Sequence, residues 1–591
     1  MRDLLNILGR PYKKKYLPYA IAAIIFMLLD VGIALFIPRV TESIFTQINK
    51  TGLSSTDLDF VLRTGLFVIL IALFAVITTI FNNIFAQIIS TRITADIRKE
   101  LFVKIQDLSF SNVDKITTGR LMTIVSNDTT QIQQILMMSF RAILRAPLTL
   151  VGAMVMAYIT NSDLFLIVLI AAPILGYIIF KILKNASRIF NNVQTKLDEL
   201  NSKLHETVSG AREIKSFVTE LDEIGRFELV NDNYKEANIK VHKLMSLIDP
   251  AIVLISNLAI AFVLLVSSYL ASTYTGDAKA AIVGNISAYI AYLQQIIVSL
   301  MILSMIAMFI SRGEVSARRI NMVLNTIIHI VNSSNPKQSP IEGEIEYRDV
   351  SFGYQDDDEQ SDSMTLKNIS FKIPSKATVG VIGSTGSGKT SLVQLLPRLY
   401  DAQAGEVLID GVNVKEYDIN YLRSQISFVT QEAIIFSGTI QSNIIQGKKN
   451  ASEAEIKKAA ELAVASEYIE NFEEKYNSKV NQAGTNLSGG QKQRLALARA
   501  LIRQPKILIL DDSTSAVDAK SEALIKDNLA TMNEQTTIII AQKISSIINC
   551  DFIIVLNNSG QLDGFGNHEE LLKTSKVYQE IYYSQTGGLH E

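Results

Sequence analysis

Six long apolar stretches in the first 310 residues constrain this chain more than any other feature. Each is close to the roughly 20 apolar residues that an α-helix needs to cross a bilayer. They lie near residues 17–37, 66–86, 138–160, 164–184, 248–272 and 283–310. Charged residues make up only 19% of the 591 positions, below the roughly 25% of an ordinary soluble domain. The sequence therefore predicts six transmembrane helices and not one large soluble core.

The charges between these spans predict their orientation. The cations before the first span are Arg2, Arg10, Lys13, Lys14 and Lys15. The long gaps near 87–137 and 185–247 are rich in Lys and Arg, whereas the short gap 160–163 has no cation. The positive-inside rule then places the N-terminus, both long gaps and the C-terminal half in the cytoplasm, with the spans in the plasma membrane. The stretch 200–217 has helical character, so we expect helices to continue beyond the lipid.

Charge and cysteine content exclude several classes of site. The formal net charge is −2, so no basic excess indicates a nucleic-acid partner. Cys550 is the single cysteine, which excludes an intramolecular disulfide and a thiolate zinc site. The five histidines are scattered without the spacing of metal ligands.

The pattern changes after the turn-rich segment NSSNPKQSP at 332–340. Apolar, β-branched stretches then alternate with helical ones, which predicts an α/β domain around a largely parallel sheet. The strands are expected at 378–383, 506–510, 536–540 and 552–556. We therefore expect a transmembrane domain at 1–325, a linker at 326–340 and a second domain at 341–591.

A phosphate-binding loop is predicted at 383–390, where GSTGSGKT fits the pattern G-x-x-x-x-G-K-[ST] between a strand and a helix. Its members are Gly383, Ser384, Thr385, Gly386, Ser387, Gly388, Lys389 and Thr390. Glycines let backbone N–H groups wrap phosphates, and the helix N-terminus adds its dipole. Lys389 would reach the β- and γ-phosphates, and the Thr390 hydroxyl would take up Mg²⁺.

Paired carboxylates follow the apolar strand ILIL, at Asp511 and Asp512. Asp511 ends the strand where a carboxylate can orient Mg²⁺. An Asp pair in this place can also cap a helix. Together with the phosphate loop, the pair favours a Mg²⁺ site.

Residues 487–491 read LSGGQ, and here the chain resembles the ATP-binding cassette (ABC) proteins. With six preceding spans, nearly the whole chain resembles an ABC exporter half-transporter. The implied fold is an α-helical six-span transmembrane domain followed by an α/β P-loop ATP-binding cassette, which uses ATP and Mg²⁺. Ser488, Gly489, Gly490 and Gln491 open a helix and form an anion site. The resemblance assigns this site to the ATP held by the opposite subunit.

The resemblance implies further roles. Tyr354 matches the aromatic residue that stacks on adenine, and Gln431 matches the glutamine that contacts Mg²⁺ and water. Asp518, at the end of STSAVD, matches the residue at the subunit junction. Segments 108–121 and 209–220 resemble the two cytoplasmic loops that dock on the cassettes, the second on the partner's cassette.

Two departures from the family pattern weaken the expected catalysis. The family's general base is a Glu after the Mg²⁺ carboxylate, but position 512 is the shorter Asp. The family's switch histidine is replaced by Gln542, which cannot carry a proton. The loop VNQAG at 480–484 also departs from the usual V-G-E-R-G.

These departures predict a subunit of a heterodimeric exporter for hydrophobic or amphipathic compounds such as drugs. Its own site would hydrolyse ATP weakly, while its LSGGQ completes the competent site of a second half-transporter that supplies the catalytic Glu. One alternative is a slow homodimeric exporter of lipid or peptide. Another is an ATP-dependent membrane sensor that transports nothing.

Polar residues within the spans leave the substrate open. Asp30 lies in the first span, where a carboxylate is costly unless it faces a cavity or a partner. It can bind a cationic amphiphile, or it can be solvated or paired. Tyr289, Tyr292, Gln294 and Gln295 form a stripe on the last span, which is either cavity lining or helix packing.

Overall fold

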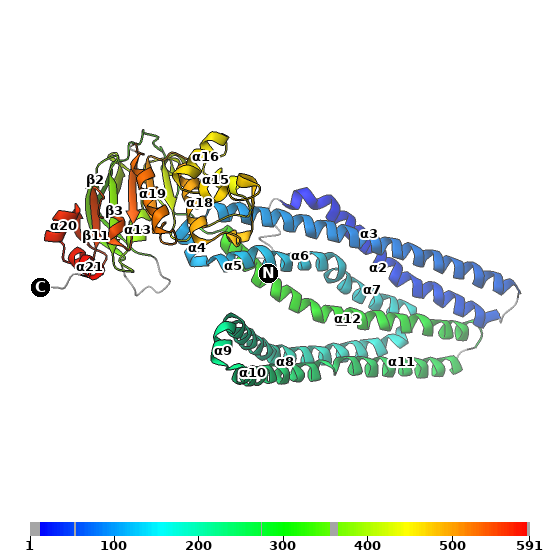
Figure 1. Cartoon of the computed structure of the whole chain (residues 1–591). Helices are drawn as coiled ribbons and strands as arrows, with labels where there is room; N and C mark the ends of the chain where they lie inside the picture. The colour runs from blue at the N-terminus through cyan, green and yellow to red at the C-terminus, as the bar shows by residue number, and fades with distance from the viewer. Residues whose placement is uncertain (1–11, 52–54, 274, 355–363, 533, 588–591) are drawn as a thin grey trace. The chain divides into compact units, whose positions relative to one another are not determined.

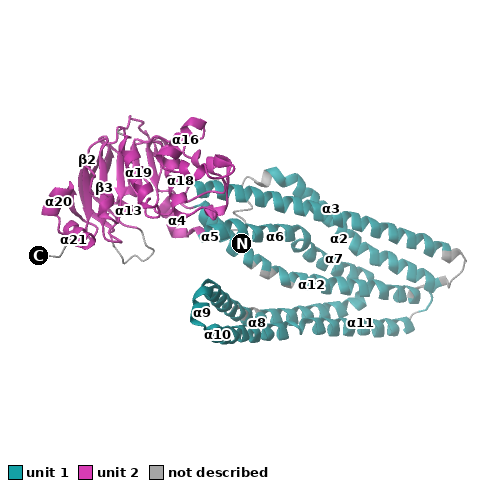
Figure 2. Cartoon of the chain, viewed as in Figure 1, with its two compact units in different colours: residues 1–106, 119–325 teal, residues 107–118, 326–591 magenta. Residues whose placement is uncertain are grey.

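The computed structural model describes residues 12–51, 55–273, 275–354, 364–532 and 534–587. The chain forms two compact units, one of residues 1–106 and 119–325 and the other of residues 107–118 and 326–591 (Figure 2). The sequence-based division placed 107–118 in the transmembrane domain, and the structure groups this segment with the C-terminal unit. Arg2 and Arg10, on which the predicted orientation partly depends, lie outside the described residues.

The first unit is entirely helical in its described part (Figure 1). Its helices are α2 (Tyr12–Thr51), α3 (Ser55–Asp107), α5 (Thr118–Thr123), α6 (Thr129–Met138), α7 (Arg145–Thr160), α8 (Ser162–Ser209), α9 (Ala211–Phe217), α10 (Glu220–Met245), α11 (Ile248–Thr273) and α12 (Asp277–Leu324). Two π-helical turns, η1 (Ile124–Asp128) and η2 (Ser139–Ile143), flank α6.

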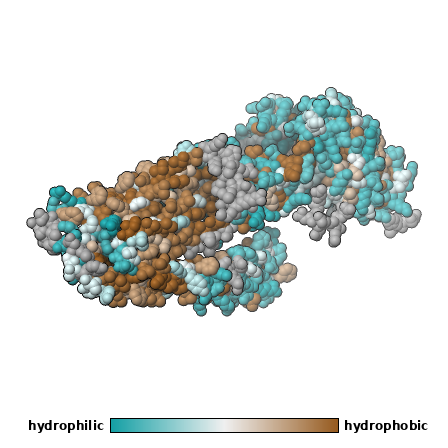
Figure 3. All heavy atoms as spheres, turned by 180° about the vertical axis from the view of Figure 1, so that it is seen from behind, coloured by the Kyte–Doolittle hydropathy of each residue, from teal (hydrophilic) through white to brown (hydrophobic). Residues whose placement is uncertain are grey.

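Six helical segments of the described residues are long and apolar enough to cross a membrane, which confirms the six predicted spans. They are Lys15–Lys50, Asp59–Asp107, Thr118–Thr160, Ser162–Ala186, Glu220–Thr273 and Lys279–Leu303. Their apolar side chains face outward: Leu66, Leu70 and Leu73 of α3 are 55–59% exposed. Figure 3 shows hydrophobic residues covering much of the visible face of this helical unit. Outward apolar surface of this extent requires lipid around it.

The helices are longer than the apolar stretches that reveal them. At about 1.5 Å per residue, the 53 residues of α3 extend roughly 80 Å, against a hydrocarbon core of about 30 Å. The predicted helical stretch 200–217 is helical but divided, because α8 ends at Ser209 and α9 starts after Gly210. α9 ends at Phe217, and the next residue, Val218, has a left-handed φ of 55°.

The second unit combines sheets and short helices. Its strands are β1 (Ile345–Phe352), β2 (Leu366–Ile373), β3 (Thr378–Gly383), β4 (Ala404–Ile409), β5 (Val412–Asn413), β6 (Ile426–Val429), β7 (Gly438–Thr439), β8 (Lys479–Val480), β9 (Ile507–Asp511), β10 (Thr536–Ile540), β11 (Phe552–Leu556) and β12 (Leu562–Gly566). Its α-helices are α4 (Phe110–Ile116), α13 (Lys389–Gln394), α14 (Ile419–Gln425), α15 (Ile440–Ile444), α16 (Glu453–Leu462), α17 (Ser466–Ile469), α18 (Gly489–Leu501), α19 (Ala519–Ala530), α20 (His568–Thr574) and α21 (Lys576–Thr586). The 3₁₀ turns are η3 (Lys475–Asn477), η4 (Gln482–Gly484) and η5 (Ile544–Ser546).

The main sheet has the strand order β12-β11-β3-β10-β9-β6. All its neighbours pair in parallel except β11 with β12. A second, antiparallel sheet has the order β2-β1-β4-β5. The predicted strands at 378–383, 536–540 and 552–556 coincide with β3, β10 and β11, and β9 is displaced by one residue from its predicted range. All five residues of β9 are buried, as expected for a strand covered on both faces.

The strand order brings the predicted site residues together. β10 lies between β3 and β9 and runs parallel to both, so the carboxyl ends of the three strands meet at one edge. Ile540, the last residue of β10, pairs with Val381 of β3 and with Asp511 of β9. The phosphate loop, the carboxylate pair and Gln542 therefore follow three adjacent strands.

Candidate nucleotide site

The phosphate loop connects β3 to α13 through residues with left-handed backbone. Gly386 and Gly388 have φ of 85° and 90°, which glycine adopts without steric cost. A Cβ on Gly388 would lie 2.8 Å from Leu366 Cδ2 and 3.1 Å from the Thr365 carbonyl oxygen. The loop thus needs glycine here both for its turn and for its close approach to β2.

The polar groups of the loop suit a phosphate ligand. Lys389 Nζ donates hydrogen bonds to the carbonyl oxygens of Gly383 (2.9 Å) and Ser384 (2.7 Å), so the ammonium stays over the loop. Burial lowers the pKa of Lys389 from its usual value, and the nearby carboxylates of Asp511 and Asp512 oppose this. The Ser387 side-chain oxygen is buried and has no hydrogen-bond partner among the described residues. The unpartnered hydroxyl of Ser387 and the third N–H donor of Lys389 fit the oxygens of a nucleoside triphosphate.

A hydroxyl and a carboxylate meet beside the loop. Thr390 Oγ1 donates to Asp511 Oδ2 at 2.8 Å, and Asp511 is only 5% exposed. Burial raises the pKa of Asp511, while the hydrogen bond from Thr390 opposes the shift. Hydroxyl and carboxylate oxygens are the ligands that Mg²⁺ takes beside substrate phosphates. Thr390 and Asp511 therefore fit the metal that the phosphate loop implies.

Asp512 binds both glutamines of the predicted catalytic set. Its backbone is left-handed (φ 46°), and its Oδ2 accepts hydrogen bonds from Gln431 Nε2 and Gln542 Nε2, each at 3.2 Å. Burial raises the pKa of Asp512, and the bond from Gln431 opposes this shift. The structure therefore brings Asp512, Gln431 and Gln542 together in one cluster, in which the side-chain nitrogen of Gln431 faces the Asp512 carboxylate.

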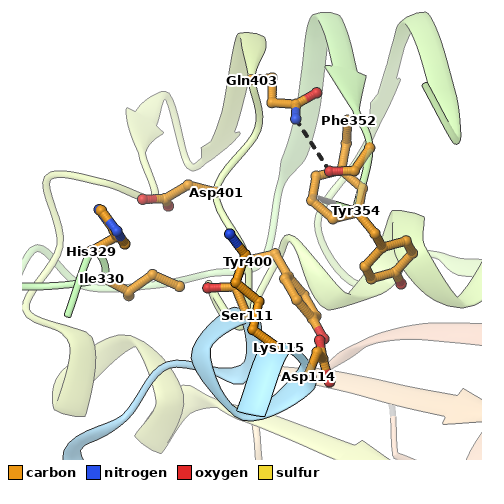
Figure 4. Close-up of a pocket in the computed structure, with 11 residues that line it drawn as sticks. Ser111, Asp114, Lys115, His329, Ile330, Phe352, Tyr354, Tyr400, Asp401 and Gln403 are labelled. Carbon is orange, nitrogen blue, oxygen red and sulfur yellow. Dashed lines mark hydrogen bonds between the residues drawn. The ribbon is translucent and has the colours of Figure 1, made fainter. Parts of the chain in front are cut away.

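Tyr354 lies beside α13. Its hydroxyl bonds to Ser391 Oγ (2.9 Å) and its ring meets Tyr400 edge-on, with centroids 5.4 Å apart. A cavity of about 590 Å³ opens beside these rings, and Figure 4 shows Tyr354, Tyr400 and Asp114 among the side chains that line it. Tyr354 itself is 41% exposed, which leaves surface of the ring available to a base.

The segment 107–118 joins this unit through α4. Tyr400 donates to Asp114 Oδ2 at 2.6 Å, and its ring lies 6.2 Å from that of Phe110. Asn112 Nδ2 donates to the Ile327 carbonyl oxygen at 3.2 Å. The first predicted docking loop thus contacts the same tyrosine that supports Tyr354.

The LSGGQ segment starts α18. Ser488 and Gln491 form a reciprocal cap, in which Ser488 Oγ accepts from the Gln491 amide and Ser488 N–H donates to Gln491 Oε1. A Cβ on Gly490 would lie 2.8 Å from the Ala516 carbonyl oxygen, so α18 packs closely on the segment after β9. No hydrogen bond of the described residues joins Ser488–Gln491 to the phosphate loop. Asp518 caps α19 by accepting from Ser521 N–H at 2.9 Å.

Comparison with known proteins identifies the family. Residues 20–300 match the family described as ABC transporter transmembrane region, and residues 366–515 match the family described as ABC transporter. An uncharacterized ABC transporter ATP-binding protein, YfiB of Bacillus subtilis, is 36% identical over 576 residues, covering 98% of each chain. The chain belongs to the ABC transporter family.

Two further matches concern the exporter type. An ATP-dependent lipid A-core flippase of Syntrophus aciditrophicus is 30% identical over 580 residues, 98% of this chain and 93% of the flippase. The structure of a bacterial Atm1-family ABC exporter with ATP bound has the same fold, with a TM-score of 0.79 at 24% identity, covering 97% of this chain and 99% of that chain. The chain is thus an ABC exporter half-transporter, a multi-pass membrane protein with an ATP-hydrolysing domain.

In the membrane half of this half-transporter, Asp30 is paired. Asp30 Oδ2 lies 2.9 Å from an Arg145 guanidinium nitrogen, and its Oδ1 accepts from Thr79 at 2.7 Å. Of the alternatives for Asp30, pairing describes the structure. An arginine within the predicted span 138–160 is a signal that could have identified this partner.

The stripe on α12 packs against neighbouring backbone. Tyr289 and Tyr292 are fully buried. Tyr289 donates to the Ala157 and Asn161 carbonyl oxygens, and Tyr292 donates to that of Leu35. Gln295 Nε2 donates to the Ala34 carbonyl oxygen at 2.7 Å, whereas Gln294 is exposed. Helix packing therefore accounts for three of the four residues.

Proposed function

We propose that this half-transporter pairs with a second, different half-transporter and exports hydrophobic or amphipathic compounds from the cytoplasm across the plasma membrane. In this proposal the N-terminus and the ATP-binding domain are cytoplasmic. The observation that carries the proposal is the pair of residues at the chemical end of the site, Asp512 and Gln542. They stand where the family has a glutamate base and a histidine.

Both residues limit proton transfer at this site. A general base must come within about 2.6–3.2 Å of the proton that it removes, and Asp is one methylene shorter than Glu. Two amide donors already bind the same oxygen of Asp512, at 3.2 Å each. Gln542 donates a hydrogen bond but carries no charge and passes on no proton. These features support a site that binds Mg²⁺ and ATP and hydrolyses ATP slowly.

The binding groups are complete, in contrast. Lys389 lies over the phosphate loop, Thr390 bonds to Asp511, and Tyr354 has a partly exposed ring, as expected for groups that would bind the phosphates, Mg²⁺ and the base. The intact cap at Ser488 presents the amides of Gly489 and Gly490 at the start of α18. We assign this helix start to the ATP of the partner, which would supply its own glutamate as the base.

An exposed apolar tip supports the presence of a second subunit. Phe217, Val218 and Leu221, at the turn between α9 and α10, are 77%, 80% and 84% exposed. Apolar side chains gathered at such a tip are typical of a covered interface. The segment 209–220 is the one that the resemblance assigns to the partner's ATP-binding domain.

One relative favours a lipid-like substrate. The flippase that is 30% identical is named for lipid A-core. A homodimeric flippase of lipid-like compounds is therefore the second candidate function. Drugs and lipids share an apolar body with a polar end, so both candidates require a membrane-facing path.

The ATPase rate of the purified chain tests the proposal. Expressed alone, the full-length chain should hydrolyse ATP slowly, and co-expression with the second half-transporter should restore turnover. Asp512→Asn removes the carboxylate charge at the proposed weak site and should change the ATPase rate of the co-expressed pair little. Fast hydrolysis by the chain alone, abolished by Asp512→Asn, would overturn the heterodimer and favour the homodimeric flippase.

A further inference from the structure

The C-terminal helix α21 reaches back to the segment that carries Gln542. Gln585 Nε2 donates to the Gln542 carbonyl oxygen at 2.8 Å, and Gln585 Oε1 accepts from the Ile544 N–H at 2.8 Å. One side chain thus satisfies two backbone groups, separated in sequence by Lys543. Gln585 comes from the penultimate position of α21, more than forty residues further along the chain.

These two backbone groups lie where the sheet has ended. β10 stops at Ile540, and the Ala541 N–H makes the last bond of this edge, to the Val381 carbonyl oxygen at 3.2 Å. Beyond Ala541 the backbone leaves the strand ladder and needs other hydrogen-bond partners. The amide of Gln585 supplies them, much as a further strand would.

The apolar contacts of α21 hold the helix in place independently of Gln585. Tyr578 is fully buried and its hydroxyl bonds to His568 Nδ1 at 2.8 Å. Tyr578 also shares a core cluster with Ile544 and Ile547. Because this core anchors the helix, the exposed Gln585 side chain is free to set the position of residues 542–544 without being needed for folding.

We propose that Gln585 is a positioning residue, which holds the 542–544 backbone so that the Gln542 amide stays directed at the catalytic carboxylate and at a bound nucleotide. The only side-chain hydrogen bond of Gln542 among the described contacts is the 3.2 Å bond to Asp512 Oδ2. A bond of that length fixes the segment weakly, whereas two backbone bonds of 2.8 Å fix it on both sides of Lys543. This inference rests on the proposed role of Gln542 at the nucleotide site.

The variants separate this role from a structural one. Gln585→Leu removes both hydrogen bonds and replaces the amide side chain with an apolar one of similar volume. Gln585→Glu keeps the acceptor for Ile544 N–H and loses the donor to the Gln542 carbonyl oxygen. Gln579→Leu is the control, because Gln579 lies on the same helix and its Nε2 donates to the Leu572 carbonyl oxygen at 2.7 Å and not to residues 542–544.

Nucleotide retention at this site is the functional measurement. The full-length transporter, assembled with its second subunit, is loaded with photoreactive 8-azido-ATP and Mg²⁺, chased with unlabelled ATP, and cross-linked at intervals. Gln585→Leu should shorten the retention time on this chain roughly three- to tenfold, as expected for the loss of two modest hydrogen bonds. The concentration for half-maximal labelling at equilibrium should rise by a similar factor, because the phosphate loop is unchanged and the association rate should be the same. Gln585→Glu should fall between wild type and Leu, and Gln579→Leu should match wild type.

Hydrogen–deuterium exchange tests whether Gln585 holds the 542–544 backbone. Peptides covering 541–547 should exchange faster in Gln585→Leu and at the wild-type rate in Gln579→Leu, since the Ile544 amide loses its acceptor only in the first. Wild-type exchange or wild-type retention in Gln585→Leu would overturn the inference.

Gln542→Ala distinguishes a failure of the positioning role of Gln585 from a failure of the proposed role of Gln542. If Gln542→Ala shortens retention and Gln585→Leu does not, Gln585 has no positioning role and the proposed site remains. If Gln542→Ala has no effect on retention, the proposed role of Gln542 fails, and the inference fails with it.

Discussion

If the site hydrolyses ATP slowly as proposed, giving it the family's longer base should accelerate it, and Asp512→Glu is the direct test. The substitution extends by one methylene the carboxylate of the residue that directly follows β9. In a preorganised site, a misplacement of about 1 Å can cost on the order of 100-fold in rate, and general-base catalysis contributes about 10²–10⁴-fold. We expect Asp512→Glu to raise the ATPase rate of the chain purified alone by about tenfold or more, with a further increase when Gln542→His is added.

The same substitution should slightly destabilise the protein. Asp512 has a φ of 46°, in the left-handed region where Asp and Asn are several-fold enriched over other non-glycine residues. A preference of that size corresponds to about 1 kcal/mol, or roughly 2–4 °C in the unfolding midpoint of a domain of about 250 residues. Asp349→Glu is the matched control, because Asp349 has a φ of 48° on β1, and its carboxylate bonds to Ser370 and not to the site.

The measurements are the initial rate of phosphate release at saturating MgATP and the thermal unfolding midpoint, both on the full-length chain in lipid nanodiscs. Asp512→Glu should combine a faster rate with a lower midpoint, and Asp349→Glu should show the lower midpoint alone. A rate for Asp512→Glu that equals wild type, in a protein that still binds ATP, would refute the argument that the length of this carboxylate limits hydrolysis.

Three further substitutions test other parts of the site. In the assembled transporter, Gly489→Ala should lower turnover about tenfold or more, while Asp512→Asn should change it less than about twofold. The Cβ added at position 489 lies 3.4 Å from Ala516 Cβ, which is an ordinary contact, so the fold should tolerate it. Equal losses from the two substitutions would contradict our assignment of α18 to the partner's site. Lys389→Ala should reduce labelled-ATP binding to this chain about tenfold yet leave hydrolysis at the other site, and complete loss of hydrolysis would count against the division of roles. Gln493→Leu should destabilise the domain by about 1–3 kcal/mol in thermal unfolding, because buried Gln493 accepts from the Ala516 N–H at 2.9 Å. Gln425→Leu is its control, because Gln425 is only half-buried, and equal midpoints would exclude this bond as a stabilising one.

The sequence alone predicted the elements whose cause is local. The six spans follow from the length of each apolar stretch, and β3, β10 and β11 follow from short β-branched runs bounded by turn residues. The residues that the motifs brought together, from the phosphate loop to Asp511, Asp512 and Gln542, follow parallel strands that the α/β pattern also indicates. Local chemistry was sufficient for these parts of the fold.

Contacts between distant segments were not predictable from such patterns. The bond from Tyr400 to Asp114 joins residues 286 positions apart, and the hydrogen bonds of Gln585 join an exposed glutamine to backbone atoms. Tyr400 and Gln585 stand in no motif or periodic pattern. The pairing of Asp30 with Arg145 is intermediate, because two opposite charges in separate spans favour a pair without specifying it.

The position of Asp512 explains how a site can lose chemistry and keep binding. The groups suited to ATP and Mg²⁺ lie on the phosphate loop and at Asp511, and their contacts, such as Thr390 to Asp511 at 2.8 Å, do not involve Asp512. Asp512 instead bonds to Gln431 and Gln542, whose amides accept no proton from water. Shortening the base and replacing the switch residue therefore leave the contacts of Lys389, Thr390 and Asp511 in place. Since phosphate and Mg²⁺ binding would depend mainly on these groups and proton transfer on residue 512, the proposed site can hold ATP through many cycles and stabilise a closed pair of ATP-binding domains without hydrolysing it.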